Sequence, residues 1–168
     1  PPAPDKPRIN GAKIYGVRPG SPFLYRIPAT GNRPITFTAQ GLPAGLILDK
    51  NTGIISGKIS GEGDYPVILS ARNESGEDER EFKIVVGQTL SLTPSMGWNS
   101  WYIHYYRVSD EIMREAADVM ISSGMADYGY DYVNIDDCWM KKVGSDDPEI
   151  GGDIRDRNNK LLCNKRFP

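Results

Sequence analysis

Two short β-type runs on either side of a helical run most constrain how the second half of the chain can fold. The first β-type run covers residues 95–99 and the second covers 130–136. Between them, apolar residues recur every four positions, which is the spacing of one helix face. These residues are Ile112, Ala116 and Met120, with Met113, Ala117 and Ile121 beside them. A strand, a helix and a strand at this length predict a βαβ unit with parallel strands.

The bounds of the helix can be read from its flanking residues. Ser109 is a suitable N-cap, and Asp110 and Glu111 place carboxylates in the first turn, where they favour the helix dipole. Gly124 is a natural stop. Residues 102–108, before the cap, are expected to form an aromatic loop.

The first half of the chain has short β-type runs without a helical period. Gly and Pro crowd into this half, and its turns place Gly where a positive φ is needed. The expected strands are 13–17, 23–27, 35–39, 46–48, 54–59, 65–71 and 81–86. This pattern predicts a β-sandwich over residues 13–89, preceded by a Pro-rich linker or edge segment at 1–12.

Composition narrows the function classes. The 168 residues include 20 Lys and Arg against 22 Asp and Glu, and this balance argues against a nucleic-acid partner. No apolar run approaches the roughly 20 residues of a membrane span. Cys138 and Cys163 form no CxxC pair, so a zinc site is not expected. We expect no metal and no cofactor. The two thiols either form one disulfide or remain free.

Indoles and carboxylates gather at the ends of the two predicted strands. Trp98 and Trp101 belong to the first end, and Asp136 and Asp137 belong to the second. Indole faces pack on the C–H face of a pyranose, and carboxylates accept hydrogen bonds from its hydroxyls. The pattern therefore indicates a sugar-binding cleft. His104 is the sole histidine, so a hydrolase triad is unsupported and we expect it to be a loop residue.

One phrase in the first half is specific. Residues 41–57 read GLPAGLILDKNTGIISG. They resemble the "putative Ig" family of bacterial surface and secreted proteins, and the resemblance extends over about residues 8–87. It implies an Ig-like sandwich without catalysis, in a secreted or periplasmic protein.

The second half resembles glycoside hydrolase family 27, the α-galactosidases and α-N-acetylgalactosaminidases. The motifs MGWNSW, GYDYVNIDDCW and RDRNNKLLCNKRFP occur in the family's order, over about residues 93–168. The resemblance implies that residues 90–168 are the start of a (β/α)₈ barrel, whose active site lies at the C-terminal ends of its strands. It also implies that Trp101 forms an apolar wall of the galactose pocket, and that Asp136 and Asp137 bind the 4- and 6-hydroxyls.

The two neighbouring acids do not fit the role of the catalytic pair. A retaining glycosidase places its carboxyl groups about 5–5.5 Å apart on either side of the anomeric carbon. Successive residues of a strand point to opposite faces. By resemblance, the nucleophile and the acid/base Asp follow on later strands, beyond Pro168. We therefore expect no catalytic residue in this chain, and no activity from the chain alone.

The sequence thus predicts an Ig-like sandwich followed by the first βαβ unit of a glycosidase barrel. The function expected from the resemblance is retaining hydrolysis of terminal α-galactosides in a bacterial oligo- or polysaccharide-degrading enzyme, with the remainder of the barrel as partner. One alternative is a related specificity, for α-N-acetylgalactosamine or β-L-arabinopyranose. Another is a non-catalytic module that binds carbohydrate or protein.

The chain departs from the family in two loops. Many members have a Cys after the MGWNSW motif that pairs with the Cys of DDCW, but residues 102–106 contain none. Residues 141–154 form a longer loop than in the shorter family members. This loop could change what lies beyond the galactose subsite.

Overall fold

The computed structural model describes residues 3–168. Within them the chain forms two compact units. The first unit contains the chain up to Ser95 together with Met125–Gly129, and the second contains Met96–Gly124 and Tyr130–Pro168.

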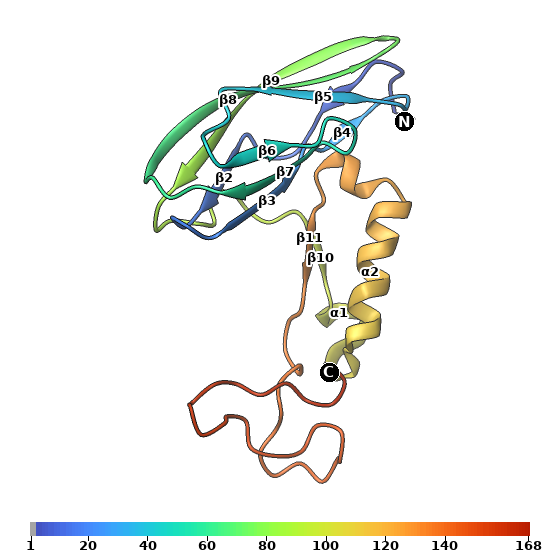
Figure 1. The fold of residues 1–168 in the computed structure, drawn as a ribbon. Coiled ribbons are helices and arrows are strands. Elements are labelled where there is room, and N and C mark those ends of the chain that lie inside the picture. Colours follow the sequence, from blue (N-terminus) through green and yellow to red (C-terminus); the bar gives the residue numbers. More distant parts are fainter. Residues whose placement is uncertain (1–2) are drawn as a thin grey trace. The chain divides into compact units, whose positions relative to one another are not determined.

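The first unit is built from β-sheets (Figure 1). The four-stranded sheet has the order β2 (Ile14–Val17), β9 (Gly76–Val86), β8 (Gly63–Asn73) and β5 (Thr36–Gln40). The three-stranded sheet has the order β3 (Pro22–Arg26), β7 (Ile54–Lys58) and β6 (Leu46–Leu48). A short pair joins β1 (Arg8–Ile9) to β4 (Ala29–Thr30). All these pairings are antiparallel except β2 with β9.

Apolar residues of both sheets form one core, as expected for a sandwich. Phe37 and Leu69 come from the four-stranded sheet, and Ile55 comes from the other; all three are fully buried. Tyr25 stacks on Phe82 with ring centroids 4.6 Å apart. Apolar and polar residues thus alternate in the strands because each sheet buries one face against the other. The predicted sandwich is confirmed.

Two glycines of the phrase at residues 41–57, Gly45 and Gly57, allow β6 and β7 to approach closely. A Cβ on Gly57 would lie 2.0 Å from the carbonyl oxygen of Gly45, and one on Gly45 would lie 2.2 Å from that of Lys58. The Lys58 N–H donates to the Gly45 carbonyl at 3.0 Å. Both glycines also have positive φ. Backbone geometry between β6 and β7 therefore explains these two glycines of the phrase.

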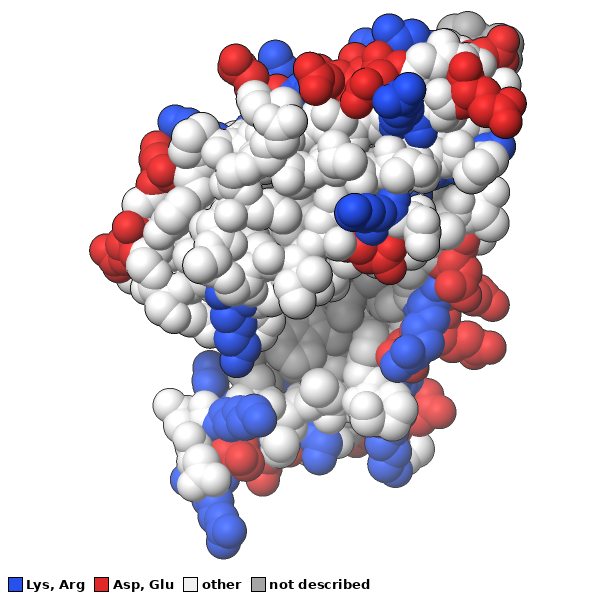
Figure 2. Space-filling model, turned by 45° about the horizontal axis from the view of Figure 1, so that its top comes forward, with Lys and Arg blue, Asp and Glu red and all other residues white. Residues whose placement is uncertain are grey.

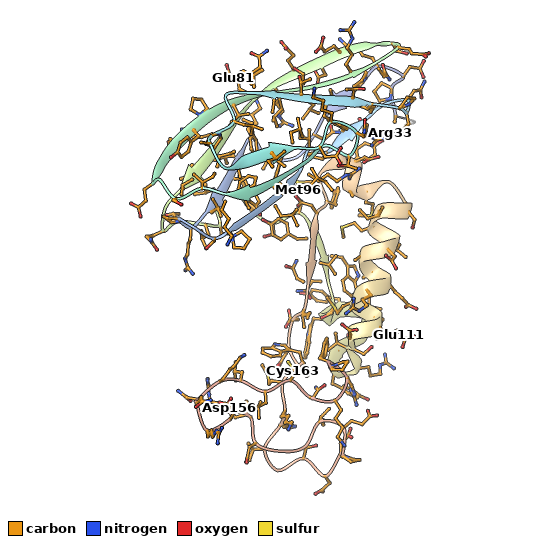
Figure 3. The ribbon with its side chains drawn as sticks, in the orientation of Figure 1. Arg33, Glu81, Met96, Glu111, Asp156 and Cys163 are labelled. Carbon is orange, nitrogen blue, oxygen red and sulfur yellow. The ribbon has the colours of Figure 1, made fainter. Side chains whose placement is uncertain are left out.

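The turn at Met125–Gly129 groups with the sandwich through specific contacts. The Asp127 carboxylate forms ion pairs with the guanidiniums of Arg26 at 2.6 Å and Arg33 at 3.0 Å. Arg33 is labelled beside this turn in Figure 3. The Asn10 amide donates to the Asp127 carbonyl at 2.9 Å, and Gly129 is buried against Gly11. The sandwich thus includes five residues from beyond the predicted first half.

The second unit contains the predicted βαβ arrangement (Figure 1). Its elements are β10 (Gly97–Asn99), α1 (Trp101–His104), η1 (Tyr105–Arg107), α2 (Asp110–Ser122) and β11 (Tyr132–Asn134). The parallel pairing of the strands and the Ser109 N-cap, which accepts the Ile112 N–H at 3.3 Å, confirm the prediction. The expected loop at 102–108 was wrong in part, because α1 and a 3₁₀ turn occupy residues 101–107.

The surface offers no single-sign patch on the face shown in Figure 2, where Lys and Arg are interspersed with Asp and Glu around a wide uncharged area. Residues 3–168 include no helix that is long and apolar enough to cross a membrane.

Gly57→Ala should lower the free energy of unfolding by about 3 kcal/mol or more, because the new Cβ meets backbone and φ is positive. Gly63→Ala is the matched control, since Gly63 has φ +144° beside +138° at Gly57 but no atom within 4 Å of the new Cβ. Its cost should be about 1–2 kcal/mol, from the backbone alone. Urea unfolding of both variants checks this, and equal costs would show that the close approach of β6 and β7 is unimportant.

Candidate functional site

The site begins where β10 and β11 end side by side. Their register pairs Trp98 with Val133 and Asn99 with Asn134. A Cβ on Gly97 would lie 1.9 Å from the Tyr132 carbonyl oxygen, so the glycine of the MGW sequence is needed for this pairing. Because the strands are parallel, the residues that follow each of them meet at the same edge.

Ser100 joins the two strand ends. Its backbone N–H donates to the Asn134 carbonyl at 3.1 Å, and its hydroxyl oxygen accepts the Asp136 N–H at 3.1 Å. The side chain is fully buried. A small hydroxyl residue at this position therefore fixes where the chain carrying Asp136 leaves the sheet.

Asn99 connects two of the predicted site residues. Its amide nitrogen donates to the Asp136 carboxylate at 3.1 Å, and its amide oxygen accepts the Trp101 N–H at 2.9 Å. Asp136 is exposed, and its other carboxylate oxygen accepts no hydrogen bond from residues 3–168. Sequence reasoning missed both Asn99 and Ser100, although they lie between the two tryptophans of the WNSW motif.

Asp137 lies at a sharp bend directly after Asp136. One of its carboxylate oxygens accepts the Cys138 N–H at 2.7 Å, and Cys138 has φ +69°. This left-handed backbone turns the chain away from the strand direction. Asp137 is exposed, so its carboxylate is accessible to a ligand.

The aromatic residues near the strand ends form two edge-to-face pairs. The Trp101 ring lies 5.6 Å from the Tyr105 ring, and the Trp98 ring lies 5.8 Å from the His104 ring. Trp101 and His104 are both half-buried. Tyr105 therefore positions the Trp101 indole, which the sequence predicted as an apolar wall.

The residues after β11 fold back on themselves through isolated bridges. Met140 pairs with Cys163, a residue that Figure 3 labels, and Arg155 pairs with Leu161. The buried Asn164 amide donates to the Cys138 carbonyl at 2.8 Å. These bonds hold the bend at Cys138 against a segment that lies 26 positions further along the chain.

Arg166, near the end of the chain, bonds to the segment at Tyr106 and to the loop at 147–149. Its guanidinium donates to the Tyr106 carbonyl at 2.7 Å, to Glu149 at 3.2 Å and to Asp147 at 3.4 Å. Its side chain is only 19% exposed, so these interactions are partly shielded from water. Residues 102–106, which include no Cys, are thus joined to the later loops by charge-assisted hydrogen bonds.

The chemistry of the two cysteines follows from their surroundings. The structure has both as free thiols, with Cys138 half-buried and Cys163 exposed. Burial raises the pKa of the Cys138 thiol, and the negative charge of Asp137 raises it further. No three His, Cys, Asp or Glu side chains of residues 3–168 gather where they could hold a metal ion.

Two family models match different parts of the chain. Residues 6–87 match the family model "Putative Ig domain", and residues 93–159 match "Alpha galactosidase A". A crystal structure described as a "putative alpha-galactosidase" from Bacteroides fragilis is 42% identical, with a TM-score of 0.84 over 99% of this chain.

The chain is an Ig-like domain followed by part of an alpha-galactosidase region.

Curated relatives of the alpha-galactosidase region come from several kingdoms. Alpha-galactosidase A of Cellvibrio japonicus is 50% identical over 82 residues, which are 48% of this chain and 17% of that protein. The alpha-galactosidase of Oryza sativa is 54% identical over 52 residues, which are 31% of this chain and 12% of that protein. The chain also spans 33% of the Bacteroides fragilis structure. It therefore corresponds to a minor part of each of these relatives.

Cys163 should react with iodoacetamide faster than Cys138 near neutral pH. The thiolate is the reacting species, and a raised pKa leaves Cys138 with less of it at a given pH. Mass spectrometry of labelled peptides over time measures both rates. In the Cys163→Ser control, the remaining thiol should react slowly until the protein is denatured. Equal rates, or the absence of free thiols before reduction, would contradict the structure.

Proposed function

We propose that this chain is the N-terminal part of a retaining exo-glycosidase that hydrolyses terminal α-galactosides. The observation that carries the proposal is the parallel pairing of β10 with β11, which brings the Trp101 backbone and the Asp136 carboxylate onto one amide, that of Asn99. Trp101, the proposed apolar wall, and Asp136, a proposed hydroxyl acceptor, then follow strands that end at the same edge of the sheet. The similarity of residues 93–159 to alpha-galactosidases supports galactose as the sugar.

The proposed roles follow from the chemistry of each side chain. The half-buried Trp101 indole offers an apolar face for the C–H groups of the sugar ring. Asp136 and Asp137 are exposed carboxylates that accept hydrogen bonds from hydroxyls, and we assign them to the 4- and 6-hydroxyls. Two acceptors at these positions favour the axial 4-hydroxyl of galactose over the equatorial one of glucose.

The covalent chemistry is assigned to residues other than these. The Asp136 carboxylate accepts a hydrogen bond from the Asn99 amide, and the Asp137 carboxylate accepts one from the Cys138 N–H. In this proposal both carboxylates bind hydroxyls of the sugar, whereas a retaining mechanism needs carboxyl groups on opposite sides of the anomeric carbon. In this proposal the chain supplies sugar recognition, and later strands of the barrel supply nucleophile and acid/base.

Replacing the binding carboxylates should weaken galactose binding. Asp137→Asn removes a charged acceptor, so the dissociation constant should rise about tenfold to a hundredfold. Trp101→Ala should raise it about tenfold through lost apolar contact. Titration calorimetry with galactose, N-acetylgalactosamine and L-arabinose measures the affinities and separates the related specificities. Asp146→Asn is the control, because Asp146 is an exposed acid of the same unit outside the proposed site. Equal effects of the two Asp substitutions would refute the assignment.

The 168-residue polypeptide should bind galactosides without hydrolysing them, because the proposal uses Asp136 and Asp137 to bind hydroxyls and assigns the nucleophile and the acid/base to later strands. Release of 4-nitrophenol from 4-nitrophenyl α-galactoside is the measurement. Turnover that is lost in Asp137→Asn would show that the pair itself is catalytic.

A further inference from the structure

The turn between α2 and β11 is the strongest feature that the proposed function leaves without a role. Its residues, Met125–Gly129, group with the sandwich, whereas α2 before it and β11 after it belong to the second unit. β11 begins at Tyr132, three residues after Gly129, and Asp136 follows the end of that strand. The contacts that fix this turn therefore act on the strand that leads to the proposed galactose site.

Charge holds the turn at Asp127. The same carboxylate oxygen, Oδ1, lies 2.6 Å from the Arg26 guanidinium and 3.0 Å from the Arg33 guanidinium. The Asp127 side chain is 27% exposed, so water screens these ion pairs less than it would at a fully exposed site. Because both guanidiniums contact one oxygen, removal of the Asp127 charge would also leave two like charges close together.

Backbone contacts fix the same turn. The Asn10 amide donates to the Asp127 carbonyl at 2.9 Å. A Cβ on Gly129 would lie 2.5 Å from the Gly11 Cα, so the two backbones touch there. The Arg80 guanidinium, from β9, donates in turn to the Gly11 carbonyl at 2.8 Å. A continuous series of contacts thus runs from the four-stranded sheet to the turn.

The strand pair that follows the turn is short and needs support. β10 and β11 pair over only three residues each, and a two-stranded ladder of this kind is at best marginally stable by itself. The Asp131 and Tyr132 N–H groups both donate to the Met96 carbonyl, at 3.1 and 3.2 Å. A turn that is already fixed lowers the entropy lost when these bonds form, since fewer linking residues have to be ordered.

We propose that the Ig-like domain is a positioning element of the galactose site. In this account the ion pairs of Asp127 with Arg26 and Arg33 keep β11 in register with β10, and so keep Asp136 bonded to Asn99. Asp127 is a positioning residue to which no contact with the sugar is assigned. The inference rests on the proposed function for its effect on galactose, whereas its effect on the strand pair is independent of that function.

Amide hydrogen exchange of the full 168-residue chain, measured by mass spectrometry, tests the effect on the strand pair. Asp127→Asn keeps the size of the side chain and removes its charge. Residues 131–136 should then exchange about fivefold or more faster, because local opening becomes easier. Residues 67–71, in the sandwich core, should keep the wild-type rate.

Asp64→Asn is the matched control. It removes the carboxylate of another ion pair of the sandwich, that of Asp64 with Lys83 at 3.1 Å, without touching the turn. Residues 131–136 and 67–71 should both exchange at the wild-type rate in this variant.

A double-mutant cycle shows whether the ion pair itself is responsible. Arg26→Gln alone should speed exchange of residues 131–136. Added to Asp127→Asn, it should speed exchange less than about twofold further, because the partner charge is already absent. Independent effects of the two substitutions would show that they act through other contacts, and would overturn the proposal.

Titration calorimetry with galactose tests the effect on the site. Asp127→Asn should raise the dissociation constant about threefold to tenfold, although no residue assigned to the sugar has changed. Asp64→Asn should bind galactose as the wild type does.

The outcomes separate the two proposals. If Asp127→Asn leaves the exchange of residues 131–136 unchanged, or speeds that of residues 67–71 equally, the positioning proposal is wrong and the proposed function stands. The same holds if exchange becomes faster but galactose binds with wild-type affinity. If the wild type binds no galactoside, the proposed function fails, and the exchange rates still decide whether the sandwich holds β11.

Discussion

The parallel pairing of β10 with β11 is the interaction on which the candidate site depends. Each strand is only three residues long, so the pairing is specified by few groups. Gly97 permits the close approach of the two backbones, and Ser100 and Asn99 then connect the residues that follow them. Since carboxyl ends of parallel strands share one edge, this short ladder brings the turn that carries Trp101 to the Asp136 carboxylate, with Asn99 bonded to both.

The second unit holds its loops by charge and backbone hydrogen bonds instead of by a disulfide. Arg166 contacts segments that are 17 to 60 positions away in sequence. Its side chain is only 19% exposed, so water weakens these charge-assisted hydrogen bonds less than it would at the surface. Asp137 of this site also lines a cavity of about 630 Å³, whose other walls include Tyr106, Met140 and Ile150.

The sequence predicted those features that local patterns determine. Alternating apolar residues indicated the sandwich, and Ser109 and Gly124 indicated both ends of α2, because capping depends on adjacent residues. It did not reveal α1, since aromatic residues at 101–107 have no strong helix preference. Asn99 was missed because its two hydrogen bonds exist only when β10 and β11 are in register.

The cavity also lay outside sequence prediction, because its walls depend on long-range bridges such as Met140 with Cys163. The grouping of Asp127 with the sandwich through Arg26 and Arg33 joins residues about a hundred positions apart, and no local pattern marks it. A crystal structure of the protein with galactose bound tests the central claim most directly. The account predicts the sugar's C–H face on the Trp101 indole and its 4- and 6-hydroxyls within hydrogen-bond distance of Asp136 and Asp137. Galactose bound elsewhere, with those three side chains facing apart, would contradict it.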